Sequence, residues 1–112
     1  MEKVRTKQQT IRALNDNLRL TWQGGKIVMS RAIACLPAKD QATIMQAVRS
    51  FRTFSKANDP YGEHDCAIFE AAGQRCMWKI DYYDAAMEFG SEDPADPSKT
   101  TRVLTIMLAS DY

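Results

Sequence analysis

The residues best suited to catalysis are one histidine and the carboxylates beside it. His64 is the single histidine of the chain, and Glu63 and Asp65 flank it. A carboxylate can hold an imidazole in one tautomer and favour its charged form, so that the ring acts as a general base. Asp81 joins this group if the chain between residues 66 and 83 folds back as a hairpin. These residues define one candidate function, a small hydrolase or nuclease-like enzyme centred on His64, Asp65 and Asp81.

A structural role for the same residues is the interpretation that we favour. The segment Asn58–Gly62 is a dense turn signal, and hydrogen bonds from His64 and Asp65 would tie such a turn to a sheet. Structural ion pairs also cluster in this way. The sequence contains no G-x-S-x-G elbow, no Walker phosphate loop and no Cys–His spacing of a known type. We therefore expect no catalytic residue.

Metal or cofactor binding is not expected either. One histidine and scattered carboxylates could bind Mg²⁺ or Mn²⁺ through oxygen, but zinc would need more His or Cys ligands. Asp59, Glu63 and Asp65 do not fit the EF-hand loop, because Pro60 and Gly62 occupy the wrong positions. The sequence predicts no metal and no cofactor.

The charges divide unevenly along the chain. Residues 1–56 hold 11 Lys and Arg against 3 Asp and Glu, whereas residues 57–112 hold 4 Lys and Arg against 11 Asp and Glu. Arg49, Arg52 and Lys56 recur at helical spacing and form a basic stripe, an electrostatic pattern of nucleic-acid binding. A solvated helix face explains the same stripe, because no known nucleic-acid-binding signature accompanies it. Nucleic-acid binding is a second alternative.

The segment 85–98 is predicted to be an acidic surface loop with several Pro and Gly residues. Its carboxylates could imitate a nucleic-acid backbone and occupy a basic groove on a protein partner, although salt screens exposed charges strongly. Aromatic side chains at residues 61 and 83 could add a contact patch. The residues expected to bind a partner are Glu88, Glu92, Asp93, Asp96, Tyr61, Tyr83, Arg49, Arg52 and Lys56.

Helices and strands must position these groups. Thr6 and Gln9 form a capping box, and apolar residues at 11, 14 and 18 continue one helical stripe. Apolar residues at 44, 47, 48, 51 and 54 indicate the clearest helix. The expected elements are a helix after Thr6, a β-like run at Lys26–Met29, a brief turn of helix after Ser30, a helix from Asp40 to about Ser55, and a strand from Thr101 to about Ala109.

A hairpin is predicted between residues 66 and 83. Gly73-Gln74 suits a type II′ turn, in which glycine supplies the positive φ of the first central position. That register opposes Phe69 to Trp78 on an apolar face and leaves His64 and Asp81 together on the other face. A slip of one residue would mix the two faces.

These elements predict a single α+β domain over residues 1–112, with two or three N-terminal helices packed on a three- to four-stranded antiparallel sheet. The composition, 45% hydrophobic and 26% charged, is that of a soluble globular protein. The sequence has no apolar run long enough for a signal peptide or a membrane span. The 3 cysteines include no C-x-x-C pair, which favours a reducing compartment. We expect a cytoplasmic protein.

Three motifs of the second half occur together. Asn58–Asp65 reads NDPYGEHD, Trp78–Asp84 reads WKIDYYD, and Thr101–Ala109 reads TRVLTIMLA. With Ile11–Arg19 and Leu36-Pro37, they make nearly the whole chain resemble a family of small bacterial domains of unknown function, found mostly in alphaproteobacteria and often on plasmids or other mobile elements. The resemblance implies a small stand-alone cytoplasmic protein and transfers no catalytic residue.

A role in countering host defences follows by association, since small proteins of mobile elements often do so. The leading expectation is a non-enzymatic binding protein, an anti-CRISPR-like inhibitor of a host defence complex that acts by covering a surface. The charged faces and the 85–98 loop would make the contact. We expect a protein partner and no membrane contact. Nucleic acid is the lesser expectation, and self-association stays open.

Overall fold

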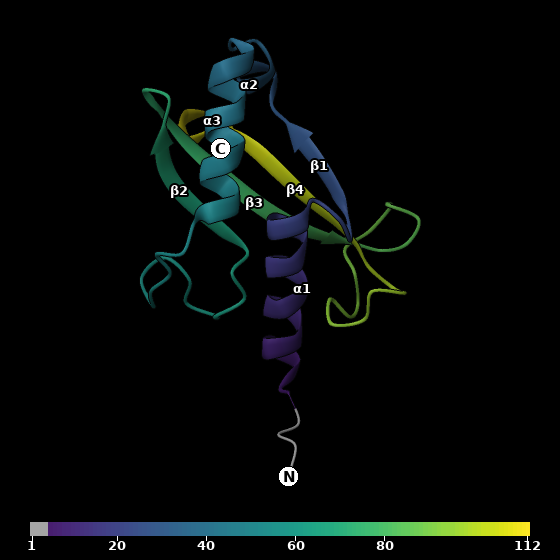
Figure 1. Ribbon diagram of the computed structural model, residues 1–112. Coiled ribbons are helices and arrows are strands. Elements are labelled where there is room, and N and C mark those ends of the chain that lie inside the picture. Colours follow the sequence, from purple (N-terminus) through teal and green to yellow (C-terminus); the bar gives the residue numbers. More distant parts are fainter. Residues whose placement is uncertain (1–4) are drawn as a thin grey trace.

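The computed structural model describes residues 5–112. The chain folds as an α+β structure, as predicted, but the first strand lies between the first two helices (Figure 1). Within the described residues, no helix is both long and apolar enough to cross a lipid bilayer. The elements are the helices α1 (Lys7–Thr21), α2 (Arg31–Ala34) and α3 (Ala38–Ser50), the strands β1 (Lys26–Met29), β2 (Cys66–Ala71), β3 (Gln74–Tyr83) and β4 (Thr101–Leu108), and a short 3-10 turn, η1 (Ala109–Asp111).

The strands of residues 5–112 form one sheet in the order β1-β4-β3-β2. The pairs β2–β3 and β3–β4 are antiparallel, but β1 runs parallel to β4, with Ile27 opposite Leu104. The prediction of a wholly antiparallel sheet is therefore wrong, and the sheet is mixed. A parallel pair needs a long crossover connection. The chain between β1 and β4 supplies one, because it contains α2, α3 and the β2–β3 hairpin.

The helices cover one face of the sheet and bury the core there (Figure 1). Trp78 of β3 is fully buried at the centre of this layer, as predicted, and the rings of Phe51 and Phe54 pack edge-on with centroids 6.2 Å from it. Alternate residues of β3, such as Lys79 and Asp81, point to the other face. The buried apolar residues of the core are Leu18, Ile33, Ile44, Val48, Ala67, Phe69, Cys76, Trp78, Ile80, Leu104 and Ile106.

The hairpin between β2 and β3 turns one residue earlier than predicted. Its turn residues are Ala72 and Gly73, whose φ values of 53° and 72° are both positive, as a type I′ turn requires. Phe69 consequently lies opposite Cys76 and not opposite Trp78. The predicted faces still hold. The alternation of apolar residues determines which face of the sheet each side chain occupies. A shift in pairing by two residues leaves every side chain on the same face.

The helix α3 ends at Ser50, before the predicted end near residue 55, because Phe51 adopts an extended conformation. A side chain of α1 closes the helix at this point. Nη1 of Arg19 donates to the carbonyl oxygens of Val48, Arg49 and Phe51 at 3.0, 3.2 and 2.7 Å. The last carbonyls of a helix have no partner within the helix, so this guanidinium replaces the missing donors.

Candidate functional site

A tight turn between α3 and β2 carries the histidine. Asp59 is buried, and its two carboxylate oxygens accept the backbone N–H of His64 at 3.2 and 3.3 Å. His64 has a φ of 54°, a left-handed conformation that costs energy for a residue other than glycine. The prediction that hydrogen bonds of His64 and Asp65 tie this turn to the sheet is met only in part: the N–H of Ile80 donates to the backbone carbonyl of Asp65 at 2.7 Å, but the ring of His64 contacts α1 and not the sheet.

The ring of His64 is held by three neighbours. It stacks on the ring of Phe54 with the centroids 3.8 Å apart. Its Nδ1 lies 2.8 Å from a carboxylate oxygen of Asp16 on α1, and its Nε2 lies 3.7 Å from a carboxylate oxygen of Asp59. Nδ1 is thus held by a hydrogen bond to Asp16, whereas Nε2 lies beyond hydrogen-bond distance of Asp59. The contact with Asp16 is a latch between the turn and α1.

The predicted grouping of His64 with Asp65 and Asp81 is formed only in part: Asp81 lies close enough to Asp65 to add to the effect of burial in raising its pKa, but the ring of His64 pairs with Asp16 instead. Asp81 pairs with Lys79 of the same strand, on the face of the sheet away from the helices. His64 lies on the helix-covered side, against Phe54. The left-handed turn at His64 precedes β2, so the strand alternation does not extend back to this residue. Asp65 stays close to the turn, and burial raises the pKa of its carboxyl.

A second polar group fixes α1 to the sheet. The amide nitrogen of Asn15, which is fully buried, donates to the hydroxyl of Tyr82 at 2.7 Å and to the carbonyl of Glu63 at 3.1 Å. Its amide oxygen accepts from Nε of Arg102 at 2.8 Å. The hydroxyl of Tyr82 donates to the carboxylate of Glu63 at 2.8 Å, and burial raises the pKa of that tyrosine. Sequence reasoning missed this group, because its partners lie far from Asn15 along the chain.

Arg19 joins α1 to both the turn and the core. Its Nη2 lies 3.4 Å from the carboxylate oxygen of Asp16 that also contacts His64. Its guanidinium carbon lies 5.4 Å from the ring centroid of Phe54 and 5.2 Å from that of Trp78, which is the range of cation–π contacts. Burial lowers the pKa of Arg19, although Asp16 opposes that effect. One oxygen of the Asp16 carboxylate, Oδ1, thus contacts both Arg19 and His64.

Three adjoining hollows follow α1 toward the end of α3. Their volumes are about 320, 320 and 260 Å³. Asp16 lines the first two, and Leu20, Arg49 and Arg52 line the second and third. The first two hollows share only Asp16, and the second and third share three residues; we call the three together the arginine groove. Its lining residues are Arg5, Gln9, Arg12, Ala13, Asp16, Arg19, Leu20, Gln46, Arg49, Ser50, Phe51, Arg52, Phe54 and His64.

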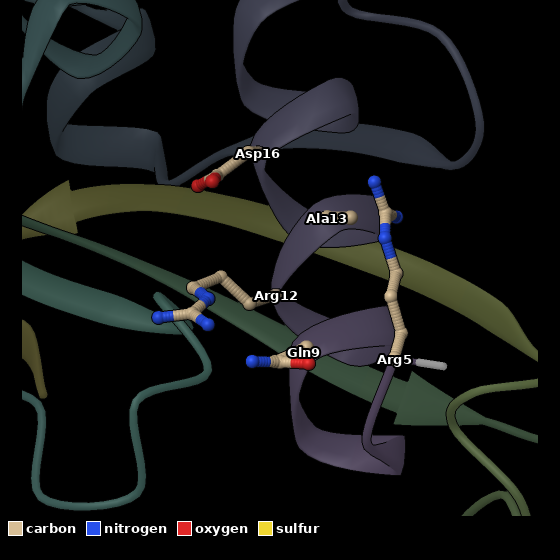
Figure 2. A pocket seen from close by; sticks show the side chains of 5 residues that line it. All are labelled: Arg5, Gln9, Arg12, Ala13 and Asp16. Atoms are coloured by element: carbon tan, nitrogen blue, oxygen red, sulfur yellow. The ribbon is translucent and has the colours of Figure 1, made fainter. Parts of the chain in front are cut away.

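Four arginines at its rim give the arginine groove its charge. Figure 2 shows the guanidinium groups of Arg5 and Arg12 on either side of the small side chain of Ala13. Arg49 and Arg52 line the other end. Among residues 5–112, none of these four arginines forms an ion pair with a carboxylate. The groove therefore offers four arginines without a carboxylate partner among the described residues, together with the carboxylate of Asp16, whose Oδ1 contacts His64 and Arg19.

The predicted basic stripe is only partly formed. Arg49 lies on α3, but Arg52 and Lys56 follow the end of that helix, so the three do not share a helical face. Arg49 and Arg52 still meet in the arginine groove, whereas Lys56 does not line it. Of the two predicted aromatic contacts, Tyr61 is 71% exposed in the turn, and Tyr83 is half-buried on the sheet face away from the helices.

The acidic loop uses much of its charge within the protein. Asp93 pairs with Lys7 of α1 at 3.2 Å, and Glu92 has a lysine nitrogen 3.8 Å from its carboxylate. Asp96 accepts the hydroxyl and the backbone N–H of Ser98 at 2.7 and 2.9 Å, and these bonds lower its pKa. These carboxylates shape the loop, which weakens the interpretation of the loop as a nucleic-acid mimic.

A protein-family model described as "Protein of unknown function (DUF3768)" matches residues 29–111. The match starts at the last residue of β1, so α1 lies outside it. No curated protein and no solved structure matches the chain. The alphaproteobacterial range and the mobile-element context expected from the sequence stay predictions. Because the matched segment covers well over half of its length, the chain belongs to the DUF3768 family of proteins of unknown function.

Proposed function

We propose that this protein is a non-enzymatic nucleic-acid-binding protein whose arginine groove holds phosphate groups. One observation carries the proposal: four arginines converge on adjoining hollows and, within the described part of the chain, none of them forms an ion pair. Guanidinium groups bind phosphate oxygens through paired hydrogen bonds. An anionic ligand can contact these arginines without breaking an existing ion pair.

Binding without catalysis is supported by the surroundings of His64 and by the one serine that lines the groove. A hydroxyl nucleophile needs a base that accepts its proton. The hydroxyl of Ser50 donates instead to the carbonyl of Gln46 at 2.8 Å. Asp16 holds Nδ1 of His64, and within residues 5–112 the ring makes no hydrogen bond to a hydroxyl or thiol that it could activate.

Inhibition of a host defence complex stays a prediction about the role of this protein in the cell. The acidic composition of the 85–98 loop favours this role, but the contacts of its carboxylates favour it less. Asp93 and Asp96 already have partners in the protein, although Glu88 is exposed. A protein that binds nucleic acid through the arginine groove could still oppose such a complex by competing for its nucleic acid.

Fluorescence anisotropy with labelled oligonucleotides tests the proposal. We expect binding at about 50 mM salt that weakens steeply as salt is added, because phosphate contacts release counterions. Four phosphate contacts would give a slope of log K against log salt of roughly −3 for a single strand and somewhat steeper for a duplex. Absence of binding at low salt to both forms would overturn the proposed function.

A pair of double variants locates the site. Arg12→Gln with Arg52→Gln removes two charges from the groove and should reduce the salt slope by roughly 1.5. Arg31→Gln with Lys39→Gln removes two exposed charges outside the groove and changes the net charge equally. Equal losses of affinity in both variants would mean that net charge, and not the arginine groove, governs binding.

A further inference from the structure

We infer that the arginine groove accepts a single strand of nucleic acid in preference to a duplex, with bases packed on Leu20 and Tyr61. This inference rests on the proposed function and deepens it, because it names the form of the ligand. A duplex presents phosphates outward and stacks its bases inside, whereas a single strand also offers the flat faces of its bases. Proteins that bind single strands combine a cationic groove with apolar or aromatic platforms.

Leu20 is the first such platform. Its side chain is 48% exposed, although it lies on α1 one residue after the buried Arg19. It lines two of the three hollows together with Arg49 and Arg52. A leucine between two cations contributes nothing to phosphate binding. It does provide an apolar surface for a base whose own phosphate lies against a neighbouring guanidinium.

Tyr61 is the second platform; it lines none of the three hollows, but it lies on the turn between α3 and β2 that packs against α1. The turn that carries it runs alongside the helix. A Cβ at Gly62 would lie 3.7 Å from the amide of Gln8, and the carbonyl of Glu63 accepts from Asn15. Tyr61 is 71% exposed. A base stacked on an exposed tyrosine gains affinity without any requirement for sequence.

The shape of the groove also favours a single strand. The part of α1 beside the groove, from Lys7 to Leu20, spans about 20 Å at 1.5 Å per residue. That length accommodates roughly four nucleotides, the low end of the site sizes found in single-strand binding folds. Three hollows of about 260 to 320 Å³ lie along this length. The wide, rigid cylinder of a duplex would contact its rim and leave the hollows unfilled.

The experiment compares four ligands at one low salt concentration. The probes are labelled oligothymidylate and oligouridylate of about 12 nucleotides, a mixed-sequence duplex of the same length, and polyglutamate as an unlabelled competitor. We expect a single strand to bind at least about tenfold more tightly than the duplex. Comparing the affinities of oligothymidylate and oligouridylate shows whether DNA or RNA is preferred. Polyglutamate should compete weakly, because it has charge but no bases.

Two variants and their matched controls test the platforms. Tyr61→Ala should weaken single-strand binding roughly tenfold, and Leu20→Ala about three- to tenfold, with little effect on the duplex. Tyr112→Ala and Ile68→Ala remove a tyrosine and an aliphatic residue that are 80% and 51% exposed away from the groove, and should change nothing. Circular dichroism of each variant checks that the fold is kept.

The outcomes separate this inference from the proposed function. Equal binding of duplex and single strand, with Tyr61→Ala and Leu20→Ala unaffected, would overturn the single-strand inference and leave nucleic-acid binding standing. Failure of every nucleic acid to bind would overturn both. Competition by polyglutamate as effective as that by unlabelled oligothymidylate would also overturn both, because the groove would then be a general site for acidic polymers, including acidic proteins.

Discussion

Replacing Arg19 tests whether a side chain of α1 terminates α3. In Arg19→Met the apolar stem remains, but the carbonyls of Val48, Arg49 and Phe51 lose their donor. Nη1 carries two hydrogens, so the three short contacts count as at most two full hydrogen bonds. A hydrogen bond to a charged group contributes about 1.5–3 kcal/mol. The gross loss in the free energy of unfolding is therefore about 3–6 kcal/mol.

Part of this loss is offset. Folding removes the charged guanidinium of Arg19 from water at a cost in free energy, and a methionine side chain has no such cost. The side chain of Arg19 is only 5% exposed, and burial lowers its pKa, so this offset is substantial. We expect a net loss of about 3 kcal/mol for Arg19→Met. For a domain of this size, that corresponds to a fall of roughly 12 °C in Tm. Arg19→Lys keeps the charge but not the planar fork, and should lose about half as much.

Urea unfolding, followed by circular dichroism and by the fluorescence of the buried Trp78, measures these changes. Arg31→Met is the matched control, because Arg31 is exposed on α2, and it should stay within about 0.5 kcal/mol of the unaltered protein. A loss below about 1 kcal/mol in Arg19→Met would refute the reasoning, since the helix carbonyls would then be satisfied without the guanidinium.

Three other changes test the turn and the buried polar groups. Ala72→Gly should stabilise the protein by about 0.5–1 kcal/mol in urea unfolding, because Ala72 has a φ of 53° that glycine adopts without strain; a loss of stability would contradict this. Tyr82→Phe should cost about 1–2 kcal/mol at neutral pH. Burial raises the pKa of Tyr82, so the unfolded chain ionises first and stability should fall as pH rises above about 10; an alkaline loss of the same size in Tyr82→Phe would show that other groups cause it. Asp65→Asn should stabilise the protein at pH 7, because burial raises the pKa of Asp65 and disfavours its ionised form. That gain should shrink as pH falls through the raised pKa, and a destabilised variant at pH 7 would count against the assignment.

Local signals in the sequence predicted local structure well. The capping box is present, with the N–H of Gln9 donating to the hydroxyl of Thr6 at 3.1 Å and the side chain of Gln9 accepting in return. Ser30 caps the short α2 as expected. The two faces of the hairpin and the burial of Trp78 also followed from alternation. Each of these depends on residues close together in the chain, where spacing alone fixes geometry.

Contacts between distant segments could not be predicted in the same way. Alternation determines a face but not a partner, so the hairpin pairing of Phe69 was wrong by two residues. Nothing in the spacing of Lys26–Met29 reveals that this strand pairs parallel with β4. The partner of His64 was missed for the same reason. Asp16 lies 48 residues earlier, and the nearer Asp65 and Asp81 suggested a site that the left-handed turn at His64 prevents.

The polar residues in the middle of α1 are explained only by their contacts in the folded structure. Asn and Asp are weak helix formers, at a cost of roughly 0.5–0.7 kcal/mol each, yet Asn15 and Asp16 stand in the middle of this helix. Together with Arg19, they tie α1 to three different segments. Asn15 contacts the sheet, Asp16 contacts the turn at His64, and Arg19 contacts the end of α3. Together they fix the position and rotation of the helix. Asp16 and Leu20 of α1 therefore lie beside the end of α3, and part of the arginine groove forms between a helix outside the matched family segment and residues within it. A relative that lacks these three tethers is expected to lack the groove, even where arginines at the end of α3 are kept.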